Sequence, residues 1–435
     1  MYKKSVFNIL TEREGDTYIW NTYTGALAKL NGEYVAAYSE GSFDESAQTT
    51  KDFLKQGYIV PSRCNEIQRL LHKEKATICD PHPKGHSFII APSMACNYNC
   101  VYCFEDGFRT GGNMSESTKR KTVDYIESVI DQNGSCEYLY ITWFGGEPLL
   151  QVDAITTMSE DLIEICRQRN MRYIASVITN GRLLTEEVFV HLRSLNLEYL
   201  QITIDGMPDV YCANKGASEE DFYAVIDNLE RACEDMVVSL RINTDLSNKK
   251  SVLTLIDYLF SRESIRRNAL LHLANIDNFH ADHDCESYRF GFDNLAFTRE
   301  IDLYLKENYG SRIRYTNFVL NKPCPCKFAR STNGCIAPDG SIYRCAEQIN
   351  KGNYIVGTVE DGLFFNETER SFSEFSHEEK CLSCAVLPIC MGYCTRDVIE
   401  KRGNIQCEAF INHAIEARLL SALSEEEQKD ELRKA

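Results

Sequence analysis

Residues 86–103 read HSFIIAPSMACNYNCVYC, an apolar run followed by a loop that holds three cysteines. Cys96, Cys100 and Cys103 are separated by three and then by two residues. Cysteine thiolates hold iron–sulfur clusters, normally four of them for a cubane, so three in one loop leave one iron without a protein ligand. An open coordination position distinguishes a catalytic metal site from a structural one. The spacing therefore favours a catalytic cluster over the two alternatives, a zinc knuckle without its fourth ligand or a set of buried thiols.

The apolar run is the first of six strand-like segments between residues 86 and 273. They are His86–Ala91, Tyr138–Phe144, Tyr173–Thr179, Leu200–Asp205, Val237–Asn243 and Leu270–Leu273. Helical periodicity fills the intervals, for example at Ser117–Asp131, Asp153–Arg169 and Asp221–Cys233. This alternation predicts right-handed βαβ units and a parallel sheet. We predict an α/β fold with a partial (β/α)6 TIM-like barrel at residues 85–300, although periodicity alone does not distinguish a barrel from an open sheet.

Polar, glycine-bearing clusters follow the strands and never precede them. After the cysteine loop they are Gly145-Gly146-Glu147-Pro148, Thr179-Asn180-Gly181, Asp205-Gly206 and Arg241-Ile242-Asn243. Ligands of parallel α/β folds bind at the carboxyl ends of the strands. The sequence therefore predicts that five loops converge on one site.

Two regions without this alternation flank the barrel. Residues 1–84 form a small α+β unit, for which we predict the strands Ser5–Leu10, Tyr18–Trp20 and Leu27–Leu30 and the helices Thr49–Gln56 and Asn65–Lys75. A helix at Phe297–Asn308 leads into a cysteine- and turn-rich region that we place at residues 301–410. Residues 411–435 read as a helical, charged tail.

The overall composition excludes several classes of protein. The chain has 435 residues, is 43% hydrophobic and 26% charged, and carries a net charge of −17, which argues against broad binding to nucleic-acid phosphates. No apolar run approaches the roughly 20 residues of a membrane helix. The apolar start is too short for a signal peptide. We therefore predict a cytoplasmic protein that binds neither nucleic acid nor membrane.

The chain has 19 cysteines, too many to be a disulfide framework in a reducing compartment. Seven are scattered in mostly apolar patterns and are interpreted as small buried residues: Cys64, Cys79, Cys136, Cys166, Cys212, Cys233 and Cys285. Nine more crowd a single region: Cys324, Cys326, Cys335, Cys345, Cys381, Cys384, Cys390, Cys394 and Cys407. Crowded thiols that are not disulfides indicate metal ligands. The polar run from His280 to Cys285 also has metal-binding composition, but nothing nearby completes a site, so we interpret it as a loop.

The cysteine triplet, with Tyr102 before its last member and Phe104 after it, resembles the signature of the radical S-adenosylmethionine (SAM) superfamily. The resemblance implies a [4Fe–4S] cluster whose open iron binds SAM, and one-electron cleavage of SAM to a 5′-deoxyadenosyl radical. It also implies cofactor contacts at Phe104, Gly145, Gly146, Glu147, Thr179, Asn180, Thr203, Asp205 and Arg241.

The later cysteines resemble the SPASM extension of radical SAM enzymes, which carries two auxiliary [4Fe–4S] clusters. The resemblance implies that Cys381, Cys384, Cys390 and Cys407 hold the second auxiliary cluster. Cys345 and Cys394 would hold the first, with two of Cys324, Cys326 and Cys335. Three thiols compete for two places, and we favour Cys326 with Cys335.

The small unit at residues 1–84 resembles a leader-peptide recognition domain, which binds a precursor by adding its leader to a sheet edge. The alternative is a packing cap on the barrel. We expect a maturase that forms a thioether or carbon–carbon crosslink in a ribosomally made, cysteine-containing precursor with a leader. Its electron donor would be a flavodoxin or ferredoxin.

Two other functions compete with this expectation. An anaerobic sulfatase-maturating enzyme, which makes formylglycine, would carry an Asp directly after Cys345, where this chain has Ala346 and then Glu347. The third possibility is a non-enzymatic iron–sulfur redox sensor or a zinc-binding interaction protein. It would not cleave SAM.

Overall fold

The computed structural model describes most of the chain, with gaps. The described residues are 1–13, 15–80, 82–105, 112–133, 136–244, 248–275, 292–309, 324–392, 394–400 and 407. The predicted polar loop at residues 280–285 and the predicted charged tail at residues 411–435 lie outside them.

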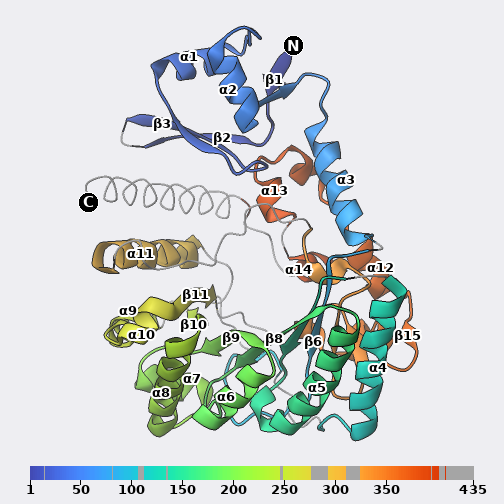
Figure 1. Ribbon diagram of the computed structural model, residues 1–435. Coiled ribbons are helices and arrows are strands. Elements are labelled where there is room, and N and C mark those ends of the chain that lie inside the picture. The colour runs from blue at the N-terminus through green and yellow to red at the C-terminus, as the bar shows by residue number, and fades with distance from the viewer. Residues whose placement is uncertain are drawn as a thin grey trace.

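Six parallel strands form the centre of the molecule (Figure 1). They are β6 (Gly85–Ile90), β7 (Tyr138–Trp143), β8 (Arg172–Thr179), β9 (Leu197–Thr203), β10 (Val238–Thr244) and β11 (Ala269–Asn275). Each pairs in parallel with its neighbours in chain order. The first and last strands do not pair with each other. The predicted α/β fold with a partial barrel is confirmed.

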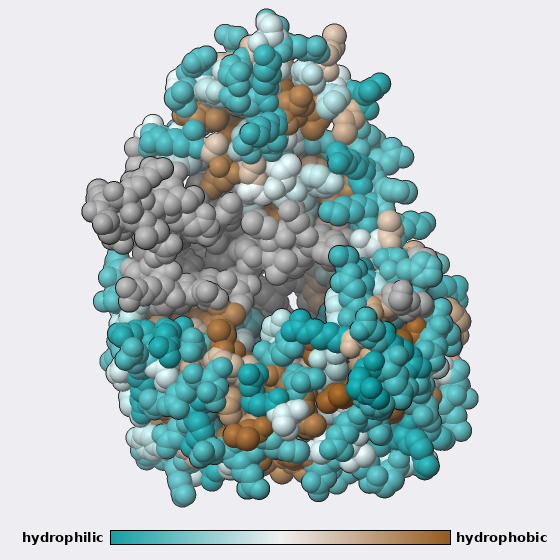
Figure 2. All heavy atoms as spheres, viewed as in Figure 1, coloured by the Kyte–Doolittle hydropathy of each residue, from teal (hydrophilic) through white to brown (hydrophobic). Residues whose placement is uncertain are grey.

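Helices cover the outer face of this sheet (Figure 1). They are α4 (Glu116–Asn133), α5 (Val152–Gln168), α6 (Glu186–Ser194), α7 (Pro208–Lys215), α8 (Glu219–Asp235), α9 (Lys249–Phe260), α10 (Glu263–Asn268) and α11 (Phe292–Tyr309). One apolar core joins their inner faces to the strands, and Figure 2 shows a largely hydrophilic outer surface over them. Among the described residues, every helix is too short or too polar to span a bilayer.

The cysteine-rich region continues the same sheet. Its strands are β12 (Gly334–Ile336), β13 (Ser341–Tyr343), β14 (Gly357–Thr358) and β15 (Gly362–Leu363). Strand β12 pairs in parallel with β6, so this region is built directly onto the first barrel strand. Its short helices are α12 (Glu367–Ser373), α13 (Leu387–Cys390) and α14 (Thr395–Ile399). Single 3₁₀ turns lie at Pro148–Gln151, Lys327–Ala329, Ala346–Gln348, Gly352–Tyr354 and Glu379–Ser383.

The N-terminal unit contains two small antiparallel sheets and three helices. Its elements are β1 (Tyr2–Lys4), β2 (Asn8–Arg13), β3 (Asp16–Asn21), β4 (Leu27–Leu30), β5 (Ile59–Pro61), α1 (Gly32–Glu40), α2 (Gln48–Gln56) and α3 (Glu66–Ile78). The predicted strand Ser5–Leu10 is wrong at its start, because Ser5–Phe7 form a turn and pairing with β3 begins at Asn8. Helix α1 was not predicted.

The N-terminal unit packs on the segment that carries the last cysteines. Trp20 lies in one apolar cluster with Val386 and Ile389 of the α13 segment. A second cluster joins Phe7 and Leu70 to that segment. At the same interface, the hydroxyl of Thr22 donates to the carbonyl of Ala385, and His377 Nε2 lies 2.7 Å from Glu74 Oε2, with both side chains buried.

Candidate active site at the carboxyl ends of the barrel strands

The loop after β6 carries the three cysteines of the triplet. Burial, together with the proximity of Glu147, Cys100 and Cys103, raises the pKa of the Cys96 thiol to about 11. The Tyr98 amide lies 3.5 Å from Cys96 Sγ and donates to it. The three thiols are therefore within electrostatic range of one another. Among the described residues, however, no three His, Cys, Asp or Glu side chains are close enough to hold a single metal ion.

Helix α7 holds this loop through its last turn. The amides of Asn99 and Val101 donate to the carbonyls of Lys215 and Asn214, each at 2.9 Å. The last carbonyls of a helix have no partners within the helix. Here the cysteine loop uses two of them, so the end of α7 fixes the course of the loop between the first and third cysteines.

The Gly-Gly-Glu loop after β7 braces the same cysteine loop from the other side. The amide of Glu147 donates to the carbonyl of Ala95 at 2.8 Å, and that of Gly146 donates to Ser93 at 3.3 Å. Gly145 has a φ of +112°, and a Cβ at either glycine would overlap the backbone of residues 93–95. Both glycines are therefore required by close backbone approach.

The Glu147 side chain faces the protein and has no exposed surface. Its carboxylate accepts from Thr179 Oγ1 at 2.7 Å, from the Asn180 amide at 2.8 Å and from the Leu149 amide at 3.0 Å. Burial raises its pKa, and these hydrogen bonds oppose the increase. The side chains of Glu147 and Thr179 therefore tie the loop after β7 to the loop after β8.

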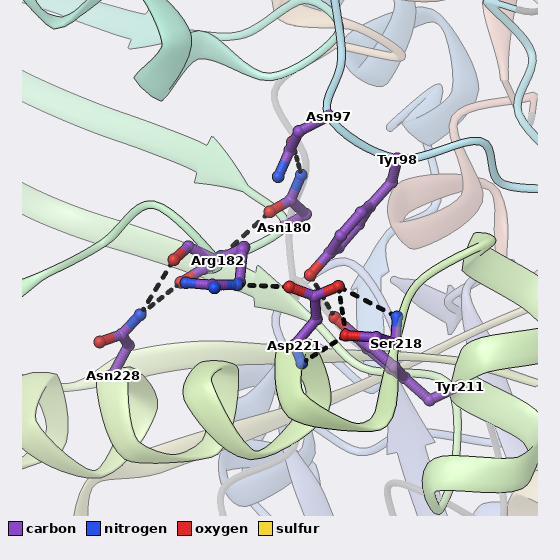
Figure 3. Close-up of polar contacts among 9 residues, drawn as sticks. Asn97, Tyr98, Asn180, Arg182, Tyr211, Ser218, Asp221 and Asn228 are labelled. Carbon is purple, nitrogen blue, oxygen red and sulfur yellow. Dashed lines mark hydrogen bonds and ion pairs between the residues drawn. The ribbon is translucent and has the colours of Figure 1, made fainter.

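A polar network connects the cysteine loop to helix α8 (Figure 3). Asn180 Nδ2 donates to Asn97 Oδ1 at 2.7 Å, and Asn180 Oδ1 accepts from the Arg182 amide at 3.0 Å. The Arg182 guanidinium pairs with Asp221, which also forms a capping box with Ser218 at the start of α8. In this arrangement the Asn180 amide positions the cysteine loop.

A buried group of charges lies beside the third cysteine. The Tyr102 hydroxyl donates to Asp205 Oδ2, and Lys215 Nζ lies 3.3 Å from that hydroxyl and 3.7 Å from the carboxylate. Burial and the Asp205 charge raise the pKa of Tyr102. Asp205 Oδ1 is buried, and the described residues give it no hydrogen-bond partner. An orphaned buried acceptor costs free energy unless a donor reaches it. A hydroxyl or amine of a bound cofactor could supply that donor.

The remaining predicted cofactor contacts lie around the same end of the barrel. Thr203 and Arg241 are paired neighbours on β9 and β10, and Arg241 Nε donates to Asn243 Oδ1 at 2.9 Å. Phe104 stacks on Phe144, with ring centroids 6.3 Å apart and planes within 9°. Three thiols, an orphaned carboxylate oxygen and a flat aromatic surface fit a cluster with a bound nucleoside.

At the predicted first auxiliary cluster, two of the three competing thiols, Cys326 and Cys335, lie near each other and near Cys345. Burial raises the pKa of Cys335 well above its ordinary value, and Cys345 and Cys326 lie close enough to raise it further. Cys324 instead packs against Ile78 of helix α3 in a separate apolar cluster. Cys324 also lies beside Cys326, because its thiol donates to the Cys326 carbonyl at 3.4 Å, so the choice of Cys326 with Cys335 stays a prediction. An ion pair between Arg396 and Glu347 joins the Cys394 segment to the Cys345 segment.

The cysteines predicted to hold the second auxiliary cluster also lie near one another. Burial raises the pKa of Cys381, and Cys407, Glu378 and Cys384 raise it further. Cys384 and Cys390 pack against the same apolar cluster around Trp20. The assignment of these four cysteines to one cluster stays a prediction that the fold accommodates.

Lys215 is the residue that the sequence analysis missed here. It is 2% exposed, lies near Tyr102, Asp205 and Glu147, and carries a cation within the site. Its only sequence signal is its place in the last turn of a helix, before Gly216. A lysine at that position is usually a solvated side chain that complements the helix dipole.

Comparisons with known proteins agree with this geometry. Residues 90–257 match the Radical SAM superfamily. The chain is 23% identical over 402 residues to the radical SAM cyclopropyl synthase TigE of Paramaledivibacter caminithermalis, a match that covers 85% of this chain and 81% of TigE. It is 29% identical over 185 residues to the Fe-coproporphyrin III synthase of Methanosarcina barkeri, a match that covers 41% of each chain.

Two solved structures share the fold. Native anSMEcpe with bound AdoMet gives a TM-score of 0.62 at 19% identity, covering 78% of this chain and 99% of that one. Streptococcus suis SuiB bound to precursor peptide SuiA gives 0.54 at 15% identity, covering 93% and 98%. With the cysteine loop, its glycine brace and the matched residues 90–257 in one barrel, this part of the chain is a radical SAM domain.

Proposed function

We propose that this enzyme modifies a ribosomally made precursor peptide by forming a thioether or carbon–carbon crosslink. The observation that carries the proposal is the N-terminal unit, a sheet-and-helix module built onto the cysteine-rich region next to the second thiol group. The relative TigE is named a cyclopropyl synthase, and the SuiB structure holds a precursor peptide, which supports a peptide as the substrate.

The N-terminal sheet has edges that suit an added strand. Strand β3 lies between β2 and β4, and among the described residues one edge of each outer strand pairs with no other strand. Added strands gain affinity from main-chain hydrogen bonds and specificity from alternate side chains. A leader bound there would be anchored to the same body as the auxiliary thiols.

The cofactors that we propose are one SAM-binding [4Fe–4S] cluster, two auxiliary [4Fe–4S] clusters and SAM. Cluster and SAM together supply one-electron cleavage to a 5′-deoxyadenosyl radical, with the electron from a flavodoxin or ferredoxin. The protein holds the cluster loop between α7 and the glycine brace, and it presents Phe104 and the Asp205 group at the cofactor position.

The sulfatase-maturating alternative is less well supported, although the fold resembles anSMEcpe. It requires a free carboxylate directly after Cys345, where the chain has Ala346. The next residue, Glu347, is ion-paired with Arg396. To accept a proton from a substrate, this carboxylate would first have to break its ion pair with Arg396.

The test uses the anaerobic holoenzyme with dithionite and SAM. We expect release of 5′-deoxyadenosine and about twelve iron atoms per chain, four for each cluster. Short peptides encoded beside the gene are then co-expressed, and mass spectrometry should find a loss of two hydrogens per bridge. Absence of 5′-deoxyadenosine, with zinc in place of iron, would contradict the proposal and favour the sensor or zinc-binding alternative.

A further inference from the structure

His272 lies inside the barrel, next to the cofactor contacts. The strand register places it directly beside Arg241 on β10, which pairs in turn with Thr203 on β9. Its neighbours Leu271 and Leu273 are buried in the core that the helices cover. Because successive side chains of a strand point to opposite faces, His272 faces the interior of the barrel.

A short chain of contacts connects His272 to the cysteine loop. The Arg241 guanidinium lies close enough to His272 to act on its charge, and Arg241 Nε donates to Asn243 Oδ1 at 2.9 Å. Asn243 in turn forms a side-chain hydrogen bond with Tyr102, the residue before Cys103. The imidazole therefore shares one interior with the loop that would hold the cluster.

The His272 imidazole is neutral at ordinary pH. Burial, together with the Arg241 charge, lowers the pKa of His272 to about 4. Among the described residues, Arg241 is the charged group that lies near the His272 ring. Among those residues, no hydrogen bond to the His272 ring is formed. Half-buried and neutral, the ring keeps a nitrogen lone pair available as a proton acceptor at ordinary pH.

The proposed crosslinking chemistry needs such an acceptor. When a substrate carbon radical bonds to a thiol sulfur or to a second carbon, one S–H or C–H bond breaks, and one proton and one electron leave. An oxidised auxiliary [4Fe–4S] cluster, if the later cysteines hold one, would accept the electron. We infer that His272 takes the proton in this bond-forming step on the precursor peptide, an inference that rests on the proposed function.

The first test measures the coupling between radical formation and crosslinking. The variants are His272→Gln and, as the matched control on the outside of the barrel, His191→Gln on helix α6, where His191 bonds Thr156. The substrate is the neighbouring-gene peptide that the unaltered enzyme is seen to crosslink. General-base catalysis contributes roughly 10²–10⁴-fold, so the crosslinking rate should fall by about 100-fold or more. Formation of 5′-deoxyadenosine should persist, because hydrogen abstraction does not use this base.

The ratio of 5′-deoxyadenosine to crosslink should therefore rise steeply in His272→Gln and stay unchanged in His191→Gln. Equal ratios in all three proteins would overturn the inference while leaving the proposed function intact. If the unaltered enzyme crosslinks no peptide, the proposed function fails instead.

The second test needs no peptide. Diethyl pyrocarbonate acylates only the neutral imidazole, so its rate of reaction at His272, followed by peptide mass mapping of the holoenzyme, reports the protonation state. The rate should stay near its maximum from pH 8 down to about 5.5. Arg241→Gln should move its midpoint toward the ordinary value of about 6.5. A midpoint above pH 8 in the unaltered holoenzyme would overturn the inference, because the ring would then be protonated and could not accept a proton.

Discussion

Replacing Gly146 with Ala tests whether the glycine brace positions the cysteine loop. A Cβ at Gly146 would lie 2.7 Å from the carbonyl carbon of Ala95, and closer still to the carbonyl oxygens of Met94 and Ala95. The shortest of these distances, 2.3 Å to the Ala95 oxygen, is 0.7 Å less than the 3.0 Å that real Cβ atoms keep, so the backbone next to Cys96 must move by about 0.7 Å. Both sides of the contact are backbone and cannot yield by a rotamer change. Overpacking of this kind costs about 1–3 kcal/mol.

The assay is iron content and 5′-deoxyadenosine formation after anaerobic reconstitution. We expect Gly146→Ala to lose about four of roughly twelve irons and most SAM cleavage, because cubane clusters need all their thiolates in place. The matched control is Gly352→Ala, since an added Cβ at Gly352 meets nothing within 4 Å. Full iron and full cleavage in Gly146→Ala would refute the idea that close approach at this glycine sets the loop.

Four further substitutions address the three thiol groups and the tryptophan that packs on the last of them. Cys100→Ala should abolish 5′-deoxyadenosine formation while the absorbance of the auxiliary clusters is retained; full activity would contradict the triplet assignment. Cys326→Ser should remove about four irons, whereas Cys324→Ser should keep them, because Cys324 packs in a separate apolar cluster; the reverse result would exchange their roles. Trp20→Ala should cost about 3–5 kcal/mol, the usual price of a large aromatic cavity, and should accelerate iron release to a chelator. Unchanged release would show that the N-terminal unit does not protect the second thiol group.

The barrel could be predicted from sequence because each strand and helix carries its own periodicity. Strand β12 could not, since Gly334–Ile336 is three residues long and pairs with β6, about 246 residues earlier in the chain. Helix α1 was missed because its apolar positions are few, although Asn31 caps its start and Gly41 ends it in a left-handed conformation. Short elements that depend on tertiary pairing leave too weak a local pattern.

The site residues, like the strands and helices, fall into those that the sequence could predict and those that it could not. The cysteines and the Gly-Gly-Glu loop were identifiable because metal ligation and close backbone approach each demand one residue type. Lys215 and His272 were not, since a lysine near a helix end and a histidine in a strand are common in solvated or core positions. Lys215 is distinguished by its burial, and His272 by its position in the strand register. Both properties appear only in the folded chain.

The interface between the N-terminal unit and the last cysteines changes how leader binding must be tested. Deletion of residues 1–75 would test it poorly, because the same cut removes Phe7, Trp20 and Leu70 from the clusters that pack on Cys381, Cys384 and Cys390. Loss of peptide modification would then follow from an exposed cluster as readily as from a missing leader site. Since β2 and β4 are the outer strands of the small sheet, substitutions confined to their edges separate the two causes. They can weaken peptide affinity while the shared apolar contacts, and with them the iron content, remain intact.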